Sequence, residues 1–360
     1  MLSALPHKYL YLVAILISMI ISAYAVRKII FITRKRKIFD IPDNIRKIHG
    51  EQIPSLGGIG VFIGYMATVP FFVAIDFKGL NYIIISSVIL FFTGVYDDIM
   101  NMRPSKKLVA QVLATFITVY FADVRITSLY GILGIEELPL WFSIALTTFF
   151  GTFFINVFNF IDGIDGLACM MTILYTLVFG SLLAMNGNTA EAFVAFSLLG
   201  ATLGLLYFNY PPAKIYMGDT GSMVTGFTIF LLSIIFIHCS ERIIWCRMSS
   251  SSAMLLAFGI LFLPIFDALR VFVLRAMKGI SPLKADRRHL HYYLLDAGLT
   301  HAGTAWLLIG VNVLTMAIAF GCQRIAMPLL PFLVVISAPS VLTAVIASKM
   351  RKNKADAALK

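Results

Sequence analysis

The stretch "NFIDGIDGLA" (159–168) places two aspartates, each followed by glycine, between two long apolar runs. The runs are "TTFFGTFFINVF" (147–158) before it and "CMMTILYTLVFGSLLAM" (169–185) after it. Runs of this length and hydropathy are typical of membrane-spanning helices. The acidic stretch therefore lies where one membrane helix is expected to end and the next to begin.

The composition extends this pattern to the whole chain of 360 residues. Hydrophobic residues make up 59% and charged residues 13%, and the mean hydropathy is +0.90. Soluble domains are roughly 45–50% apolar and about 25% charged. Because the apolar runs are too long and unbroken for barrel strands, we predict an all-α polytopic membrane bundle that forms one domain over residues 1–360.

About eleven segments are candidates for membrane spans. Since the bilayer core cannot solvate an open backbone, each is expected to be a helix. The candidate spans are residues 9–26, 56–75, 80–96, 108–123, 139–158, 166–186, 190–208, 221–239, 253–273, 303–321 and 327–347.

The distribution of Lys and Arg predicts the orientation of these spans. Loops near 27–55, 97–107, 157–166, 209–220 and 274–302, together with the tail from 348, hold 22 of the 29 Lys and Arg residues. The positive-inside rule then makes these loops cytoplasmic, with the N-terminus outside and the C-terminus inside. The net charge of +11 follows from this topology and from contact with anionic membrane lipids, and it gives no reason to infer a nucleic-acid partner.

Four polar motifs fall on the predicted cytoplasmic side. A single acid at the end of a span is often only a solvated cap, but acids at membrane depth are costly and tend to be kept for function. Four motifs on one side therefore predict a shared site. They are "GVYDDIMNMRPSKK" (94–107), "NFIDGIDGLA" (159–168), "NYPPAKIYMGDTGS" (209–222) and "KGISPLKADRRHLHYY" (278–293).

The motifs contain five aspartates that could meet. Asp97 and Asp98 are adjacent, Asp162 and Asp165 are expected to share one face of a helix, and Asp219 lies in a Gly-Asp-Thr-Gly turn. Five carboxylates held together would repel one another unless a cation joined them. Oxygen ligands without a cysteine cluster suit Mg²⁺, which leaves positions for water and substrate phosphates. The alternative for Asp162 and Asp165 is that they only cap the next helix.

The last motif supplies the complementary positive charge. Its side chains are donors of the kind that bind phosphate or a polar sugar, namely Arg287, Arg288, His289 and His291. Two histidines at positions i and i+2 do not share a helix face. We therefore expect them in a loop that reaches over a cleft rather than in a zinc site.

Taken in order, "VYDD" (95–98), "NFIDGIDGLA" (159–168), "MGDTGS" (217–222) and "GISPLKADRRHLH" (279–291) resemble the motif series of the polyprenyl-phosphate N-acetylhexosamine-1-phosphate transferases. The resemblance implies transfer of GlcNAc-1-phosphate from UDP-GlcNAc to undecaprenyl phosphate, which gives undecaprenyl-pyrophosphoryl-GlcNAc and UMP. It implies a Mg²⁺-dependent enzyme, in which Mn²⁺ can substitute, with its site on the cytoplasmic face of the bacterial inner membrane. The reaction would begin a cell-surface polysaccharide of the O antigen or enterobacterial common antigen type.

The resemblance also assigns roles to residues by their place in the motifs. Tyr292 stands where the family pattern has a third histidine, so another UDP-N-acetylhexosamine is the alternative donor. The oligomeric state is not fixed, and a homodimer is one alternative. The implied roles are catalysis for Asp97, Asp98, Asp162 and Asp165, substrate binding for Asn159, His289 and His291, and metal binding for Asp219 and Asp98. Arg287 and Arg288 are expected to bind substrate because of their charge.

Two rival functions fit an acidic helical bundle less well. A cation-coupled transporter should hold its acids near the bilayer midplane in repeated halves, and a scaffold that only binds lipid phosphate would not need five acids. Asp267 and Arg270 lie inside a predicted span, where we expect an i,i+3 ion pair. Cys239 and Cys246 fall in a predicted outer loop and could pair in an oxidising compartment.

Overall fold

The computed structural model describes residues 7–36, 53–73, 79–239, 250–279, 287–325 and 327–358. The regular structure of this part of the chain is helical, apart from one isolated bridge between Ser128 and Glu137. The helices are α1 (His7–Arg36), α2 (Gly57–Phe72), α3 (Leu80–Met100), α4 (Pro104–Phe121), η2 (Ile132–Gly134), α5 (Leu140–Ile161), α6 (Leu167–Met185), α7 (Thr189–Asn209), α8 (Gly218–Cys239), α9 (Ser250–Ile260), α10 (Phe262–Ala276), α11 (Leu290–Asp296), α12 (His301–Arg324) and α13 (Leu329–Ala358).

Ten of the predicted spans each fall on one helix of this structure, and the span predicted at 253–273 falls on two, α9 and α10. In the described ranges, 8 helices are long and apolar enough to cross a membrane, or 9 if α9 and α10, bent by 69° at their junction, form one broken span. The other two predicted spans coincide with α2, which has only 16 residues, and with the more polar α4. The prediction of an all-α polytopic membrane protein is confirmed, whereas the count of eleven spans and their orientation stay predictions.

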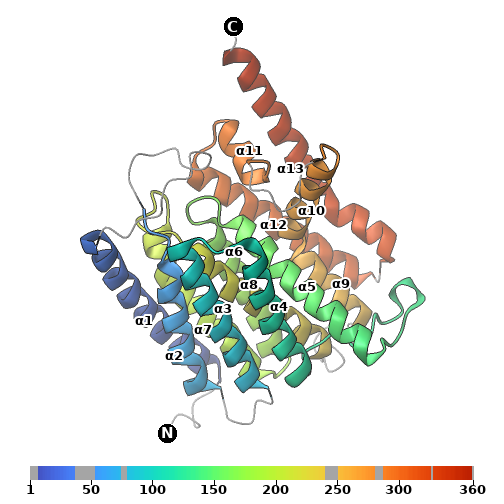
Figure 1. Cartoon of the computed structure of the whole chain (residues 1–360). Helices are drawn as coiled ribbons and strands as arrows, with labels where there is room; N and C mark the ends of the chain where they lie inside the picture. The colour runs from blue at the N-terminus through green and yellow to red at the C-terminus, as the bar shows by residue number, and fades with distance from the viewer. Residues whose placement is uncertain are drawn as a thin grey trace.

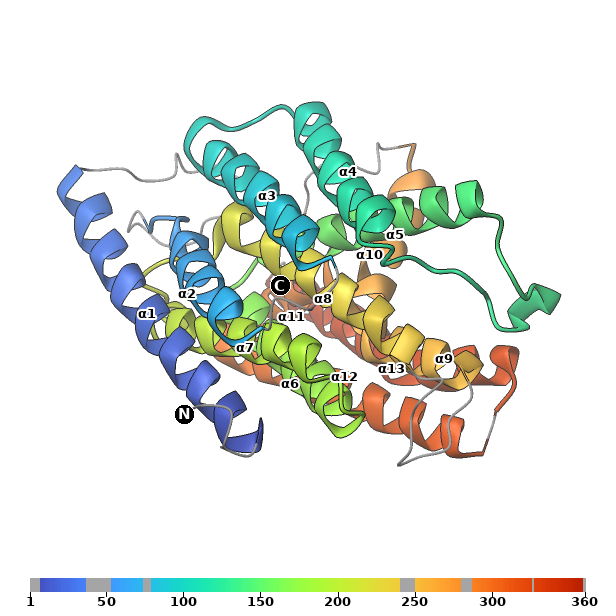
Figure 2. The ribbon, with the colours of Figure 1, turned by 90° about the horizontal axis from the view of Figure 1, so that it is seen from below.

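Successive long helices alternate in direction, so their connections lie at two opposite ends of the bundle (Figure 1). Helix α1 begins at one end and α13 finishes at the other, where α13 runs on beyond its neighbours. Figure 2 shows α1 and α2 along one side of the molecule and α8 in its interior.

Cys246, the predicted partner of Cys239, lies outside the described residues.

Helix α8 is the centre of the bundle. Of its 22 residues, 19 are buried, and it packs against α2, α3, α5, α6, α7 and α9. Glycines permit this close packing, because a Cβ at Gly94 would lie only 2.4 Å from the Cα of Thr220, and a Cβ at Gly58 only 2.0 Å from the backbone nitrogen of Gly221. In a bilayer, small residues let helix backbones approach one another. As a result, α2 and α3 lie directly against the first turn of α8.

Candidate active site

The first turn of α8 is held by one carboxylate from α3 and one from the turn that follows α5. Asp98, on α3, accepts hydrogen bonds from the backbone N–H of Asp219 at 2.8 Å, and from the N–H and hydroxyl of Thr220 at 2.9 and 2.6 Å. Asp162 accepts one from the backbone N–H of Gly218 at 2.9 Å. The first N–H groups of a helix have no partner within the helix, and its positive dipole end favours anions. Asp98 and Asp162 therefore supply acceptors that α8 lacks.

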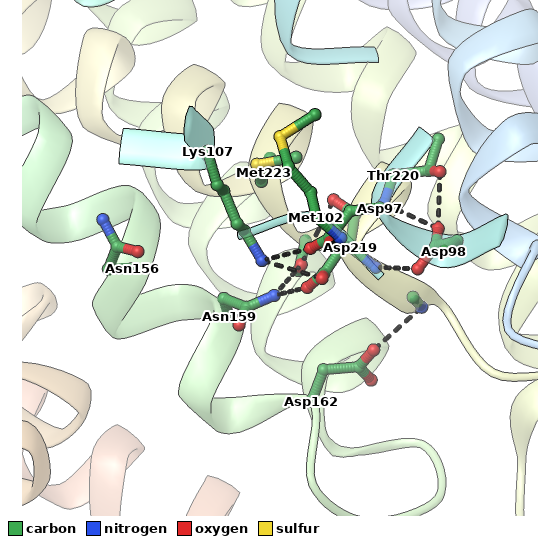
Figure 3. A network of polar contacts seen from close by, with 12 residues as sticks. Asp97, Asp98, Met102, Lys107, Asn156, Asn159, Asp162, Asp219, Thr220 and Met223 are labelled. Atoms are coloured by element: carbon green, nitrogen blue, oxygen red, sulfur yellow. Dashed lines mark hydrogen bonds and ion pairs between the residues drawn. The ribbon is translucent and has the colours of Figure 1, made fainter. Parts of the chain in front are cut away.

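Lys107, in the first turn of α4, joins two further carboxylates. Its Nζ lies 2.7 Å from Asp219 Oδ2 and 3.0 Å from Asp97 Oδ2. Asn159 donates from Nδ2 to the other oxygen of Asp219 and, at 2.8 Å, to the hydroxyl of Ser222. Figure 3 shows these side chains pointing toward one another from α3, α4, α5 and α8. The structure thus assembles a polar cluster at one end of an apolar bundle.

The stretch that contains Asp162 and Asp165 is a turn, so the prediction that the two share a helix face is wrong. Helix α5 ends at Ile161 and α6 begins at Leu167, after Gly166 with a φ of +77°. A positive φ suits glycine because it has no Cβ. Neither aspartate caps α6: its N-cap residue is Gly166, whose backbone N–H donates to Asn209 Oδ1 at 3.1 Å. The two carboxylates instead bind separate partners.

Asp162 and Asp165 differ in their electrostatics. Burial raises the pKa of Asp162 to about 7, although its side chain keeps some contact with solvent. Burial also favours a higher pKa for Asp165. Hydrogen bonds from His301 and from the backbone N–H of Ala213 outweigh burial and hold the pKa of Asp165 below its usual value. His301 Nδ1 lies 3.2 Å from Asp165 Oδ1, and the Ala213 N–H lies 3.1 Å from Oδ2. Asp165 is therefore anchored to α12 and to the connection between α7 and α8, residues 210–217.

Asp267 anchors residues 287–296, which carry His289 and His291 and are called the histidine segment below. Its carboxylate lies 3.0 Å from His289 Nδ1 and accepts the backbone N–H of Leu290 at 3.1 Å. It also pairs with Arg270 at 2.8 Å, as expected for the i,i+3 ion pair. Arg270 in turn donates to the backbone oxygen of Arg288 at 2.5 Å. The i,i+3 pair of Asp267 and Arg270 thus also fixes the start of α11 in place.

The two histidines are buried, so the expectation of an open loop over a cleft is wrong. Their rings stack nearly parallel with centroids 5.7 Å apart, and His291 lies inside α11. His291 packs against the turn at 162–166, called the acidic turn below. The contact is close, since a Cβ added at Gly163 would lie 2.3 Å from His291 Nε2. That nitrogen has no hydrogen-bond partner in the described part of the chain. Burial, followed by the neighbouring His289, lowers the pKa of His291 to about 3.

The two arginines of this segment are also engaged by the protein. Arg287 donates to Asp296 at 2.9 Å, and its guanidinium lies 4.8 Å from the ring centroid of Tyr292. Arg288 contributes its backbone oxygen to Arg270. The stretch from Asn159 to Gly166 contacts two groups of residues. Asn159 binds the acid cluster, which consists of Asp97, Asp98, Asp219 and Lys107, and Gly163 contacts His291 of the histidine segment.

The acid cluster fits a divalent cation held by two protein ligands. In the ranges that the structure describes, no three His, Cys, Asp or Glu side chains form a metal-binding group. Asp97 and Asp219 nevertheless converge on a single cation, the ammonium group of Lys107. One or two carboxylates are the usual protein contribution to a Mg²⁺ site, with water and substrate phosphates as the other ligands. Because Asp98 already accepts three hydrogen bonds, the geometry favours Asp97 as the partner of Asp219.

Lys107 and His301 are not among the site residues predicted from the sequence. Lys107 contributes there only to the positive charge of a cytoplasmic loop, yet the link between α3 and α4 is just three residues long, 101–103. A short link between antiparallel helices brings their ends together, which was the available signal for a contact with Asp97. His301 follows Thr300, whose hydroxyl accepts the N–H of Gly303 at the start of α12. Nothing local indicated that it would reach Asp165.

Comparison with known proteins adds a second line of evidence. Residues 80–237 match the family model of glycosyl transferase family 4. This range contains the five aspartates and Lys107 but ends before the histidine segment.

Three relatives extend the similarity beyond that range. The chain is 31% identical over 285 residues to the undecaprenyl-phosphate alpha-N-acetylglucosaminyl 1-phosphate transferase of Salmonella typhi, covering 75% of this chain and 74% of the relative. It is 28% identical over 264 residues to the probable undecaprenyl-phosphate N-acetylglucosaminyl 1-phosphate transferase of Bacillus subtilis (strain 168), covering 73% and 71%. It is 30% identical over 278 residues to the decaprenyl-phosphate N-acetylglucosaminephosphotransferase of Mycolicibacterium smegmatis, covering 71% and 68%.

Proposed function

The chain belongs to glycosyl transferase family 4, and we propose that it transfers GlcNAc-1-phosphate from UDP-GlcNAc to undecaprenyl phosphate. A phosphate oxygen of the acceptor bonds to the donor phosphorus that carries the sugar. The bond from that phosphorus to the bridging oxygen breaks, and UMP leaves with that oxygen. The products are undecaprenyl-pyrophosphoryl-GlcNAc and UMP. The activities named for the three relatives support this reaction.

The observation that carries the proposal is the cluster of Asp97, Lys107 and Asp219 at the ends of membrane helices. A phosphate monoester with a second pKa near 6 is largely dianionic at neutral pH, so the acceptor needs little help from a base. The main obstacle is repulsion between two anions. Asp97 and Asp219 would hold Mg²⁺, which when bound supplies neutralisation of the phosphate charges. The ammonium group of Lys107 adds positive charge at the same place.

The remaining residues of the site position these groups. Asp98 and Asp162 hold the first turn of α8, and Asn159 orients the carboxylate of Asp219. Asp165, within the turn at 162–166, and the histidine segment, which packs against this turn, are proposed to bind the sugar nucleotide. The contact of His291 with Gly163 favours this arrangement, because it joins the segment to the residues beside Asp162.

The protein is a multi-pass membrane protein. We infer that it resides in the bacterial inner membrane with the site facing the cytoplasm, where it would start a cell-surface polysaccharide. The excess of Lys and Arg in the loops at the site end supports this orientation. The five acids lie at or beside helix ends, and Asp98 and Asp162 bind the N-terminus of α8, which favours a transferase over a transporter whose acids relay ions at the midplane.

The direct test is to incubate the purified protein with Mg²⁺, undecaprenyl phosphate and a panel of UDP-sugars, and to follow UMP release and the lipid product. We expect UMP release with UDP-GlcNAc only when the lipid phosphate is present, and a lipid product that carries pyrophosphate and one N-acetylhexosamine. Preference for another UDP-N-acetylhexosamine would change the assigned donor. Absence of a lipid-linked sugar with every donor would refute the transferase.

A further inference from the structure

The end of α11 is bound by the last helix of the chain. Asp296, the final residue of α11, accepts a hydrogen bond from Arg287 Nη2 at 2.9 Å, and its other oxygen lies 3.2 Å from Arg351 Nε on α13. The guanidinium of Arg351 also lies 4.6 Å from the ring centroid of Tyr293. Arg351 thus contacts two residues of α11 through two different kinds of interaction.

The length of α13 explains why Arg351 reaches this position. At 1.5 Å per residue, the 22 steps from Leu329 to Arg351 span about 33 Å, close to the roughly 30 Å of the bilayer core. Arg351 therefore emerges from the membrane at the end of the bundle that carries the site. Figure 1 shows this part of α13 beside α11.

The histidine segment is consequently held at both ends. Its beginning is fixed by α10, where Asp267 binds His289 and the backbone of Leu290. Its end is fixed by α13, through Asp296 and Tyr293. Arg270 of α10 also lies over Tyr293, 5.1 Å from the ring centroid, so that ring is contacted from both helices. An isolated exposed ion pair contributes little, but this one belongs to a network whose members each have at least two partners.

We propose that Arg351 is a positioning residue for donor binding: by holding Asp296 and Tyr293, the end of α13 keeps the histidine segment packed against the acidic turn. The proposal rests on the function proposed above, because it assumes that this segment binds the sugar nucleotide. Arg351 itself touches neither the acid cluster nor the two histidines among the contacts of the described chain. Loss of Arg351 therefore changes the KM for the donor and not the KM for the acceptor.

The test compares Arg351→Ala, Arg351→Lys and Lys352→Ala in the full chain. Lys352 is the matched control, because it is an exposed cation on the next position of the same helix. Arg351→Ala should raise the KM for UDP-GlcNAc about 5–20-fold while the KM for undecaprenyl phosphate and the melting temperature stay near wild type. Arg351→Lys, which keeps a cation beside Asp296 and Tyr293 but loses the planar guanidinium, should be intermediate.

Hydrogen exchange of the backbone N–H groups of residues 290–296 provides a readout that does not depend on activity. Exchange should be faster in Arg351→Ala and unchanged in Lys352→Ala. Unchanged exchange and an unchanged donor KM in Arg351→Ala would overturn the proposal, as would an equal rise of both KM values with a lower melting temperature. If the wild type transfers no sugar phosphate at all, the proposed function fails, whereas faster exchange in Arg351→Ala would still establish that α13 holds this segment.

Discussion

Asp98 on α3 holds the N-terminus of α8 at Asp219, a residue 121 positions later in the chain. The backbone N–H of Asp219 donates to Asp98 Oδ1 at 2.8 Å, which satisfies a helix N–H that has no partner within α8. The side chain of Asp219 is left to face Lys107 at 2.7 Å. The two aspartates therefore lie in one cluster but have different tasks: Asp98 positions α8, and Asp219 presents its carboxylate.

Substitution by asparagine should separate these two tasks. Asp219→Asn removes the charge that faces the cation, so kcat/KM should fall at least about 100-fold, roughly 2.7 kcal/mol of transition-state stabilisation, with melting nearly unchanged. In Asp98→Asn an amide NH2 group replaces one of the two carboxylate oxygens, and this group cannot accept the N–H of Asp219 or Thr220. The variant should therefore lose activity and also about 1–3 kcal/mol of stability. Kinetics and thermal melting of both variants check this. Equal loss of stability in the two would contradict the division of tasks.

Metal removal should abolish transfer. If Asp97 and Asp219 hold Mg²⁺, activity should disappear in a chelator and return on addition of Mg²⁺ or Mn²⁺. Binding of Mn²⁺, followed by electron paramagnetic resonance without substrates, should weaken in Asp219→Asn and change little in Lys352→Ala. Full activity in excess chelator would exclude the proposed role of the carboxylate pair.

Asp162→Asn should affect activity and stability in opposite directions. As part of the site, the substitution should lower kcat/KM at least about 100-fold. Burial raises the pKa of Asp162 to about 7 from its usual 3.8, so the wild type loses stability as the pH rises from 3.8 through 7. Without divalent cations, Asp162→Asn should therefore melt above the wild type at pH 8, with a smaller difference at pH 5. A variant with normal turnover would remove Asp162 from the site.

His291 should make the wild type less stable in acid. Its pKa is lowered to about 3 in the fold, while an unfolded histidine has a pKa of about 6.5. The unfolded state therefore binds more protons below pH 6.5, and stability should fall as the pH decreases from 6.5 toward 3. His291→Gln removes this contribution, so the difference in melting temperature between pH 7.5 and 5.5 should be smaller in the variant. Parallel curves for the two proteins would show that His291 is not held neutral.

Cysteine labelling tests the orientation of the bundle. Ser105, exposed at the start of α4, lies at the site end, and Glu137, exposed in the connection before α5, lies at the other end. In a cysteine-free background, Glu137→Cys should react with a membrane-impermeant maleimide in intact spheroplasts. Ser105→Cys should react only after the membrane is opened. The reverse pattern would invert the predicted topology.

The sequence by itself determined the helical membrane fold and the set of acids that could act together. Hydropathy is a local property, so each apolar run predicts its own helix regardless of which helices surround it, and all the predicted spans are helical. The motifs also marked Asp97, Asp98, Asp162, Asp165 and Asp219 as candidates, because acids beside apolar runs are costly wherever the chain places them.

Only the tertiary structure decided which partner each acid meets. Asp98 reaches the first turn of α8 because Gly94 lets the two helix backbones nearly touch at Thr220. Lys107 became part of the cluster, and the turn after Ile161 sent Asp162 and Asp165 to separate partners. These contacts join residues between 10 and 122 positions apart. They depend on the packing of helices against one another, which the hydropathy and spacing of one segment do not specify.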